Sequence, residues 1–324
     1  NGDNGLCFAF MGFPGRRIRS RKTIGSQRVI QGINPSTAPC FCIQCPTLLK
    51  VKNVGLEISV ELLDYLVAAR FEGADAADFL QAQLSADIGA LEPGDAVFAC
   101  YCSPKGQVFG LLLVCRLENG FRIIGSTELL PAMMERLRMF VFRSKVKFEM
   151  EESSLVYGLR PSETRPATGA FQPAGLKVRY LVTDVSAEAE PAGGFKALEI
   201  SKKIAWLDKN TTEKFSPQML GYEQIGAVSF TKGCYPGQEI VARARYLGKV
   251  KRQPAILTAD IDNTISNGDR VELERDGSWV NGTVIDSARD ADGLSYLFVV
   301  TSAEPEPPIR EFRHDGRTYR CATT

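Results

Sequence analysis

The sequence KGCYPGQE, at Lys232–Glu239, is the stretch from which the fold and function of this chain are most readily inferred. Its two glycines and one proline predict a tight turn, and Gln238–Tyr246 follows with the spacing of a helix. Cys234 therefore precedes a helix N-terminus, where free N–H groups and the helix dipole favour an anion. With Lys232 nearby, the thiolate form of Cys234 is favoured. An inert cysteine buried beneath the turn is the alternative.

Regular patterns on both sides of this stretch indicate a mixed α and β protein. Val228–Phe230 is strand-like, and Asp75 is expected to N-cap a helix. Strand patterns at Ala96–Cys102 and Gln107–Arg116 enclose a turn that contains proline and glycine. After residue 250, short strands such as Ser295–Thr301 alternate with turns. This predicts a small antiparallel barrel or sandwich at the C-terminal end.

Composition argues against several classes of protein. The 324 residues include 39 basic and 38 acidic side chains, a balance unlike that of a dedicated nucleic-acid binder. No apolar run approaches the roughly 18 residues that a membrane-spanning helix needs. The one histidine, His314, argues against histidine-dependent triads and multi-histidine zinc sites. Nine cysteines without regular spacing argue against a disulfide framework and favour a reducing, cytoplasmic location.

Residues 1–50 differ from the rest of the chain. They carry seven basic residues and one acidic residue, a net of +6, which leaves −5 for the remainder. This composition, rich in Gly, Pro and Ser, predicts a disordered or mis-assigned leader. An organellar transit peptide is the alternative, and it would place the protein in a mitochondrion or plastid. Cys40, Cys42 and Cys45 suggest a metal site, but no fourth ligand lies nearby in the sequence.

The stretch around Cys234 resembles a known family. It matches the signature K-G-C-[FY]-x-G-Q-E-x-x-x-R of the YgfZ proteins, the folate-binding relatives of the glycine-cleavage T-protein. The matching positions are Lys232, Gly233, Cys234, Tyr235, Gly237, Gln238, Glu239 and Arg243. Weaker matches are Gly73–Asp75, Phe79, Gln81, Gln83 and Asp87, the Lys105-Gly106 turn, and Phe140, Arg143, Lys145 and Val146. The resemblance covers roughly residues 55–302 and leaves residues 1–50 unexplained.

The resemblance implies an α+β fold with a T-protein-like, folate-binding body and a C-terminal antiparallel β-barrel. We therefore divide the chain into a leader at 1–50, a body at 51–250 and a barrel with its tail at 251–324. The resemblance also implies a role in which the protein binds folate and supports maturation or repair of iron–sulfur enzymes, including tRNA-modifying ones. The family's functional cysteine and lysine correspond here to Cys234 and Lys232, and Cys234 becomes a transient iron ligand.

The expected cofactor is tetrahydrofolate or another reduced folate. The resemblance implies contacts from Tyr65, Phe195, Gln238, Glu239 and Arg243. The family's E-A-G-x-P segment, whose glutamate contacts the pterin in T-proteins, is replaced here, and Ser201 stands at the glutamate position. Glu199, two residues away, would lie on the same face if this segment were a strand and would then substitute for it.

A second departure concerns catalysis. T-proteins use an aspartate at the position that Phe109 occupies here, and a phenyl ring cannot accept a proton. We therefore predict a protein without aminomethyltransferase activity, with a folate-dependent aminomethyltransferase as the alternative. A third class, a thiol-redox or RNA-associated module, would use Cys234 with Arg243, Arg245, Lys249, Lys251 and Arg252. The expected partners are folate and iron–sulfur client enzymes, without a membrane and without strong direct nucleic-acid binding.

Overall fold

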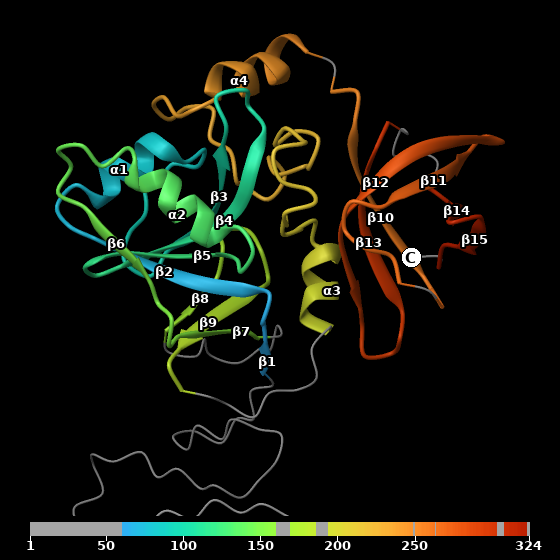
Figure 1. The fold of residues 1–324 in the computed structure, drawn as a ribbon, viewed down its shortest axis with the longest axis horizontal. Coiled ribbons are helices and arrows are strands. Elements are labelled where there is room, and N and C mark those ends of the chain that lie inside the picture. The colour runs from blue at the N-terminus through green and yellow to red at the C-terminus, as the bar shows by residue number, and fades with distance from the viewer. Residues whose placement is uncertain are drawn as a thin grey trace, which may run out of the picture. The chain divides into compact units, whose positions relative to one another are not determined.

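The computed structural model describes residues 60–159, 169–185, 194–248, 250–262, 264–302 and 308–322. The predictions made for residues 1–50, including those for Cys40, Cys42 and Cys45, lie outside these residues, as does Lys249. Figure 1 shows the described helices and strands, coloured from blue to red in the order of the sequence.

The body is built around a five-stranded antiparallel sheet and two helices. The sheet order is β3 (Ala96–Cys102), β4 (Val108–Leu117), β5 (Gly120–Ser126), β2 (Leu66–Glu72) and β6 (Lys147–Met150). Strand β4 is buried along most of its length because its sequence VFGLLLVC is apolar on both faces. Helices α1 (Ala76–Gln83) and α2 (Leu130–Arg138) contact β5, and Met133 of α2 lies over Gly110 of β4.

A second, four-stranded antiparallel sheet completes the body. Its order is β1 (Val60–Leu62), β7 (Leu155–Leu159), β9 (Arg179–Thr183) and β8 (Ala170–Phe171). Helix α3 (Gly194–Ser201) contributes Phe195, whose ring lies against Gly158 of β7. A Cβ at Gly158 would be only 2.4 Å from that ring, so the glycine is required for this close packing.

The C-terminal part is a curled, six-stranded antiparallel sheet. Its order is β10 (Gln253–Ala259), β13 (Ser295–Thr301), β12 (Ser278–Arg289), β11 (Arg270–Arg275), β14 (Glu311–His314) and β15 (Arg317–Arg320). The sheet has its own apolar core, which includes Leu273 and Phe312. Just after β15, the Ala322 amide donates to the Thr258 carbonyl of β10 at 2.6 Å, so the two sheet edges meet there. The expected C-terminal barrel is thus present as a curled, half-barrel sheet.

The body and this sheet share one apolar core. Strands β12 and β13 contact α3, and Ile285, Phe298 and Val300 belong to the main hydrophobic cluster of the body. The register of β12 against β13 shifts between Val284 and Asp286, which marks a β-bulge. The bulge lies next to Asp286, whose carboxylate contacts Lys196 and the Trp206 amide of the body.

Several expected elements have the expected bounds. Ala96–Cys102 and Ser295–Thr301 are strands over those residues, and Asp75 occupies the N-cap of α1. The Asp75 carboxylate, however, makes no cap hydrogen bond and instead accepts from the Lys145 amide at 2.6 Å.

Two expectations about strands were wrong. Val228–Phe230 forms no strand. This segment is held instead by a hydrogen bond from the Ser229 amide to the Ser85 carbonyl. The segment that contains Glu199 is helix α3 and not a strand. Phe195, Ala197 and Glu199 alternate as buried residues, which imitates the period of a strand within a short helix.

Candidate functional site

The turn before α4 (Gln238–Leu247) interlocks with the turn between β3 and β4 (Figure 1). Gly237 is the N-cap of α4 and has a φ of 79°, a conformation that favours glycine. A Cβ at Gly237 would lie 2.4 Å from the Ser103 carbonyl oxygen, and one at Gly106 would lie 2.9 Å from Cβ of Ile240. Glycine at both positions therefore allows the two turns to pack against each other.

Lys232 anchors this turn to the end of α1. Its side chain is buried, and Nζ donates to the Leu84 carbonyl at 2.6 Å and to the Gln81 carbonyl. The ammonium group also lies 5.3 Å from the centroid of the Tyr235 ring. Burial lowers the pKa of Lys232 to about 8, and the Asp87 carboxylate acts in the opposite direction. The motif lysine thus satisfies carbonyl groups at the C-terminus of a helix.

Cys234 lies exposed in the same turn and is the one exposed cysteine in the part of the chain that the structure describes. It comes four residues before the first residue of α4. Of the α4 residues expected to contact folate, Glu239 and Arg243 are exposed and Gln238 is half-buried. The structure therefore brings Cys234, Gln238, Glu239 and Arg243 together at the α4 end of the body.

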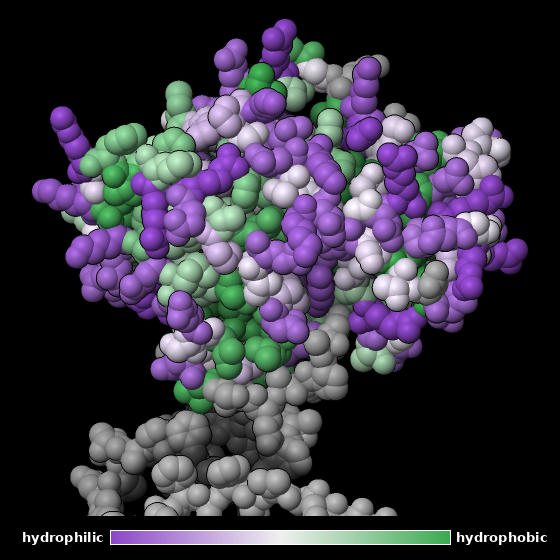
Figure 2. Space-filling model, viewed as in Figure 1, coloured by the Kyte–Doolittle hydropathy of each residue, from purple (hydrophilic) through white to green (hydrophobic). Residues whose placement is uncertain are grey.

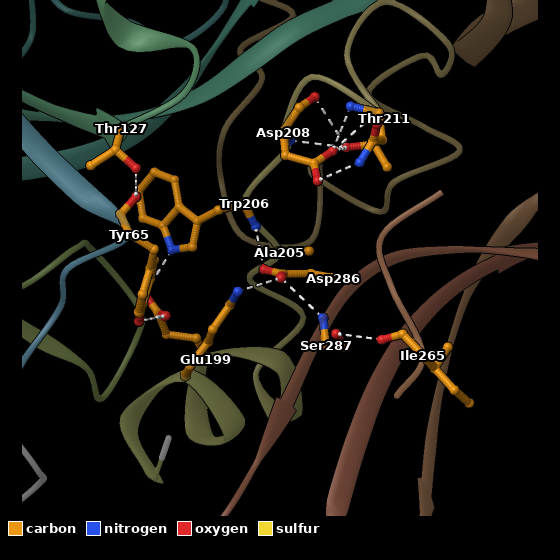
Figure 3. Close-up of polar contacts among 12 residues, drawn as sticks. Tyr65, Thr127, Glu199, Ala205, Trp206, Asp208, Thr211, Ile265, Asp286 and Ser287 are labelled. Carbon is orange, nitrogen blue, oxygen red and sulfur yellow. Dashed lines mark hydrogen bonds and ion pairs between the residues drawn. The ribbon is translucent and has the colours of Figure 1, made fainter. Parts of the chain in front are cut away.

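A second group of residues surrounds the carboxylate of Glu199. Glu199 is fully buried, and three donors contact it: Tyr65 Oη at 2.6 Å, Tyr180 Oη at 2.6 Å and Trp206 Nε1 at 2.9 Å. Figure 3 shows Tyr65 and Trp206 converging on this carboxylate. Burial raises the pKa of Glu199 to about 7, against the opposing effect of these hydrogen bonds. The group can thus change its charge close to neutral pH.

Lys196 and Asp286 extend this polar group to the C-terminal sheet. Lys196 Nζ lies 4.8 Å from the centroid of the Tyr65 ring and 2.7 Å from an oxygen of Asp286. The other Asp286 oxygen accepts from the Trp206 amide at 2.9 Å, as Figure 3 shows. Asp286 is fully buried, so both of its oxygens require the partners that they have.

The expected folate residues form two groups and not one. Tyr65 and Phe195 lie with Glu199 beside α3, near the middle of Figure 1, whereas α4 lies at the top of the view. Strand β3 runs between the groups: Phe98 contacts the rings of Tyr180 and Trp206, at 6.3 and 5.9 Å. Burial raises the pKa of Tyr235, and Cys102 and Cys100, farther along β3, add to this increase. Tyr235 therefore lies near this end of β3. Phe98 and Cys102 are four residues apart along β3, so the parts of the strand beside the two groups lie about 13 Å apart.

The two aromatic residues expected to flank the folate ring differ in their surroundings. Tyr65 is half-buried and keeps one face beside Lys196. Phe195 is fully buried, with its ring 5.5 Å from that of Tyr180 and against Gly158. Sequence reasoning did not identify Tyr180 and Trp206, which complete the shell of Glu199. Their aromatic character was visible, but no local spacing connects them to α3.

Phe109 is part of the packed core of the body. Its ring is 6.0 Å from that of Tyr101, and the guanidinium of Arg136 lies 4.6 Å above it. No group of three or more metal-ligating side chains is present among the described residues. Across the same residues, none of the helices has the length and apolarity to cross a membrane.

The overall arrangement is that of a glycine-cleavage T-protein fold. The crystal structure of glycine cleavage system aminomethyltransferase T from Bartonella henselae superposes with a TM-score of 0.60 and 15% identity, covering 81% of this chain and 83% of that one. That likeness establishes the fold alone. No family model matches the chain.

Relatives define the family within this fold. The tRNA-modifying protein YgfZ of Edwardsiella ictaluri is 27% identical over 299 residues, covering 81% of this chain and 90% of that protein. The protein of that name from Klebsiella pneumoniae is 27% identical over 303 residues, covering 83% and 93%. An uncharacterized protein of Haemophilus influenzae is 30% identical over 235 residues, covering 71% and 84%. The chain belongs to the YgfZ family.

Proposed function

We propose that this protein binds a reduced folate and supports the assembly or repair of iron–sulfur enzymes, including tRNA-modifying ones, without itself transferring a one-carbon group. The T-protein fold supports the folate part, and relatives named as tRNA-modifying proteins support the link to tRNA modification. In this role Cys234, exposed in its turn, acts as a transient iron ligand for the client. We expect the protein to act in the cytoplasm.

The observation that carries the folate proposal is the carboxylate of Glu199. A pterin ring presents adjacent N–H donors, for which a carboxylate is the matching acceptor. A carboxylate has about four acceptor sites, and Tyr65, Tyr180 and Trp206 occupy three of them. One site remains on the oxygen that Tyr65 contacts, and rotation of the half-buried Tyr65 would release a second. The acceptor chemistry of Glu199 therefore supports the proposal of a pterin at this carboxylate.

Calorimetric titration with tetrahydrofolate tests this assignment. Glu199→Gln should weaken binding by about tenfold or more, because a charged hydrogen bond contributes about 1.5–3 kcal/mol. Ser201→Ala is the matched control, since Ser201 is exposed and its hydroxyl donates to the Leu198 carbonyl of its own helix. It should bind as the unmodified protein does.

Tyr65→Phe provides a second variant that keeps the carboxylate and removes one competing donor. It should bind tetrahydrofolate at least as tightly as the unmodified protein, because it frees an acceptor site on Glu199. Equal affinity of all these variants would remove Glu199 from the site. Absence of saturable binding by the unmodified protein would overturn the folate proposal itself.

The contribution of Cys234 is tested by complementation of a strain that lacks its own YgfZ protein. Cys234→Ser should fold normally, because the side chain is exposed, and should fail to complement. The alternative function, aminomethyl transfer, requires a proton acceptor where Phe109 packs between Tyr101 and Arg136. Turnover of an aminomethyl donor to methylene-tetrahydrofolate by the purified protein would favour that alternative.

A further inference from the structure

Helix α4 and the residues just after it expose several large apolar side chains. We call this the α4 surface. It consists of Ile240, Tyr246, Leu247 and Val250, with exposed fractions of 46%, 68%, 83% and 43%. Large hydrophobic side chains clustered in this way mark an interaction site more often than isolated ones do. Figure 2 shows hydrophobic and hydrophilic residues side by side in this region, at the top of the view.

The inner side of α4 is firmly held, so its outer side is presented in a fixed position. Val241 is buried, and its carbonyl accepts from Gln218 Nε2 at 2.9 Å. Arg245 is paired with Glu223 and lies 4.8 Å from the centroid of the Phe230 ring. These contacts orient the helix before any partner arrives, which lowers the entropic cost of binding.

The outward face of α4 combines apolar and basic side chains. Ile240, Arg243 and Leu247 recur at positions i, i+3 and i+7, which share one face of a helix. Arg243 is exposed, as are Lys251 and Arg252 beyond the helix. Residues 238–252 carry a net charge of +4, whereas the rest of residues 51–324 carries −9. The α4 surface therefore lies within a positively charged segment of an otherwise acidic part of the chain.

The positive charge around the α4 surface indicates which kind of partner could bind there. A second copy of the chain, joined through the same surface, would place two positive regions against each other and is disfavoured. A nucleic acid would match the charge but offers little contact for Ile240, Leu247 and Val250. A protein with an acidic rim around apolar side chains would satisfy both features.

We propose that the α4 surface docks a protein partner with an acidic, apolar-centred surface, and that this partner is the iron–sulfur client itself. This inference rests on the proposed function and specifies where the client binds. The exposed Cys234 lies four residues before α4, a stretch of chain that spans at most about 14 Å. A client seated on α4 would thus hold its cluster within reach of the thiol.

The test measures binding of a purified iron–sulfur enzyme that thiolates tRNA to the full chain, with variants on and off the α4 surface. Leu247→Asp should weaken binding by about tenfold or more, as expected for an exposed apolar anchor at an interface centre. Phe142→Asp is the matched control, because Phe142 is equally exposed, at 83%, and lies in the segment after α2. Its affinity should match that of the unmodified protein. Arg243→Glu should weaken binding and reduce its dependence on salt.

The outcomes separate this inference from the proposed function. Equal binding by the Leu247→Asp and unmodified proteins would overturn the α4 assignment and leave the proposed function in place. A lack of binding by the unmodified protein would overturn the choice of partner, and competition by free tRNA would assign the surface to nucleic acid instead. Full complementation by Cys234→Ser would overturn the iron-ligand part of the proposed function, while the binding comparison would still decide the role of α4.

Discussion

The ammonium group of Lys232 lies 2.6 Å from the carbonyl oxygen of Leu84, and it thereby closes the C-terminus of a helix that begins more than 150 residues earlier in the chain. The most characteristic lysine of the sequence motif is thus a structural anchor in this fold. The sequence placed Lys232 beside Cys234 and suggested that it acts on the thiol, whereas the structure engages its donors with backbone carbonyls. The orientation of the Cys234 turn depends on this contact.

Replacement of Lys232 by methionine should therefore lower the free energy of unfolding by about 1–3 kcal/mol, because buried carbonyl groups lose a donor. Urea unfolding measures this change. Lys105→Met is the control, since Lys105 lies exposed in the β3–β4 turn that packs beside the motif. If the two variants unfolded at the same urea concentration, the anchoring role of Lys232 would be wrong.

Glu199 should make stability depend on pH in a direction opposite to that of most carboxyl groups. Burial raises its pKa to about 7 in the folded protein, so the folded state holds the proton more tightly than the unfolded chain does. The resulting stabilisation is present at low pH and is lost as the pH rises through about 7. Relative to Glu199→Gln, the unmodified protein should lose about 2–3 kcal/mol between about pH 5 and pH 8.

Thermal or urea unfolding of both proteins across this range gives the comparison. Other carboxyl groups, such as Glu151, whose pKa is lowered by Arg122 and Arg70, contribute equally to both proteins and cancel in the difference. Parallel stability curves for the two proteins would show that Glu199 does not carry the pH dependence.

The two glycines of the motif should respond differently to alanine. Gly237→Ala places a methyl group at a φ of 79° and 2.4 Å from the Ser103 carbonyl, and should cost about 2 kcal/mol or more. Gly233→Ala meets no atom within 4 Å and should change stability by less than about 0.5 kcal/mol. Calorimetric unfolding of the pair measures both values. Similar losses in the two variants would contradict the interlocked turns.

The cysteines of the described chain should react with iodoacetamide in a fixed order. Cys234 is exposed and should be labelled first. Cys321 is half-buried, and burial together with Glu311 raises its pKa to about 11, so it should react much more slowly. Cys100 and Cys115 are buried, which raises the pKa of both thiols, and should react only after unfolding. Peptide mapping by mass spectrometry at increasing times would reveal any other order.

The sequence predicted the turn around Cys234 well because its signals are local. Gly237, Gln238 and the apolar positions of α4 lie within a few residues of one another, so turn chemistry and helix spacing define them together. The strand at Ala96–Cys102 was predicted for the same reason. These features depend on neighbours along the chain and not on the rest of the fold.

The shell around Glu199 could not be predicted in this way. Its donors come from the turn before β2, from β9 and from the segment after α3, and only the tertiary fold brings them together. Glu199 was recognised as a substitute for the family's glutamate on the condition that its segment were a strand, but the segment is helix α3, and only the fold shows which groups surround the carboxylate. The anchoring role of Lys232 could not be predicted from the sequence for a related reason, because its partners lie about 150 residues away along the chain.

The buried carboxylate of Asp286 makes the two halves of the described chain thermodynamically inseparable. Cutting before β10 would strip Lys196 of its counter-charge and the Trp206 amide of its acceptor, and would expose the part of the main core that Ile285, Phe298 and Val300 fill. Body and sheet should therefore melt in a single transition, and neither piece should accumulate as a folded fragment after proteolysis between them. The boundary near residue 250 separates two architectures, but they form one cooperative unit.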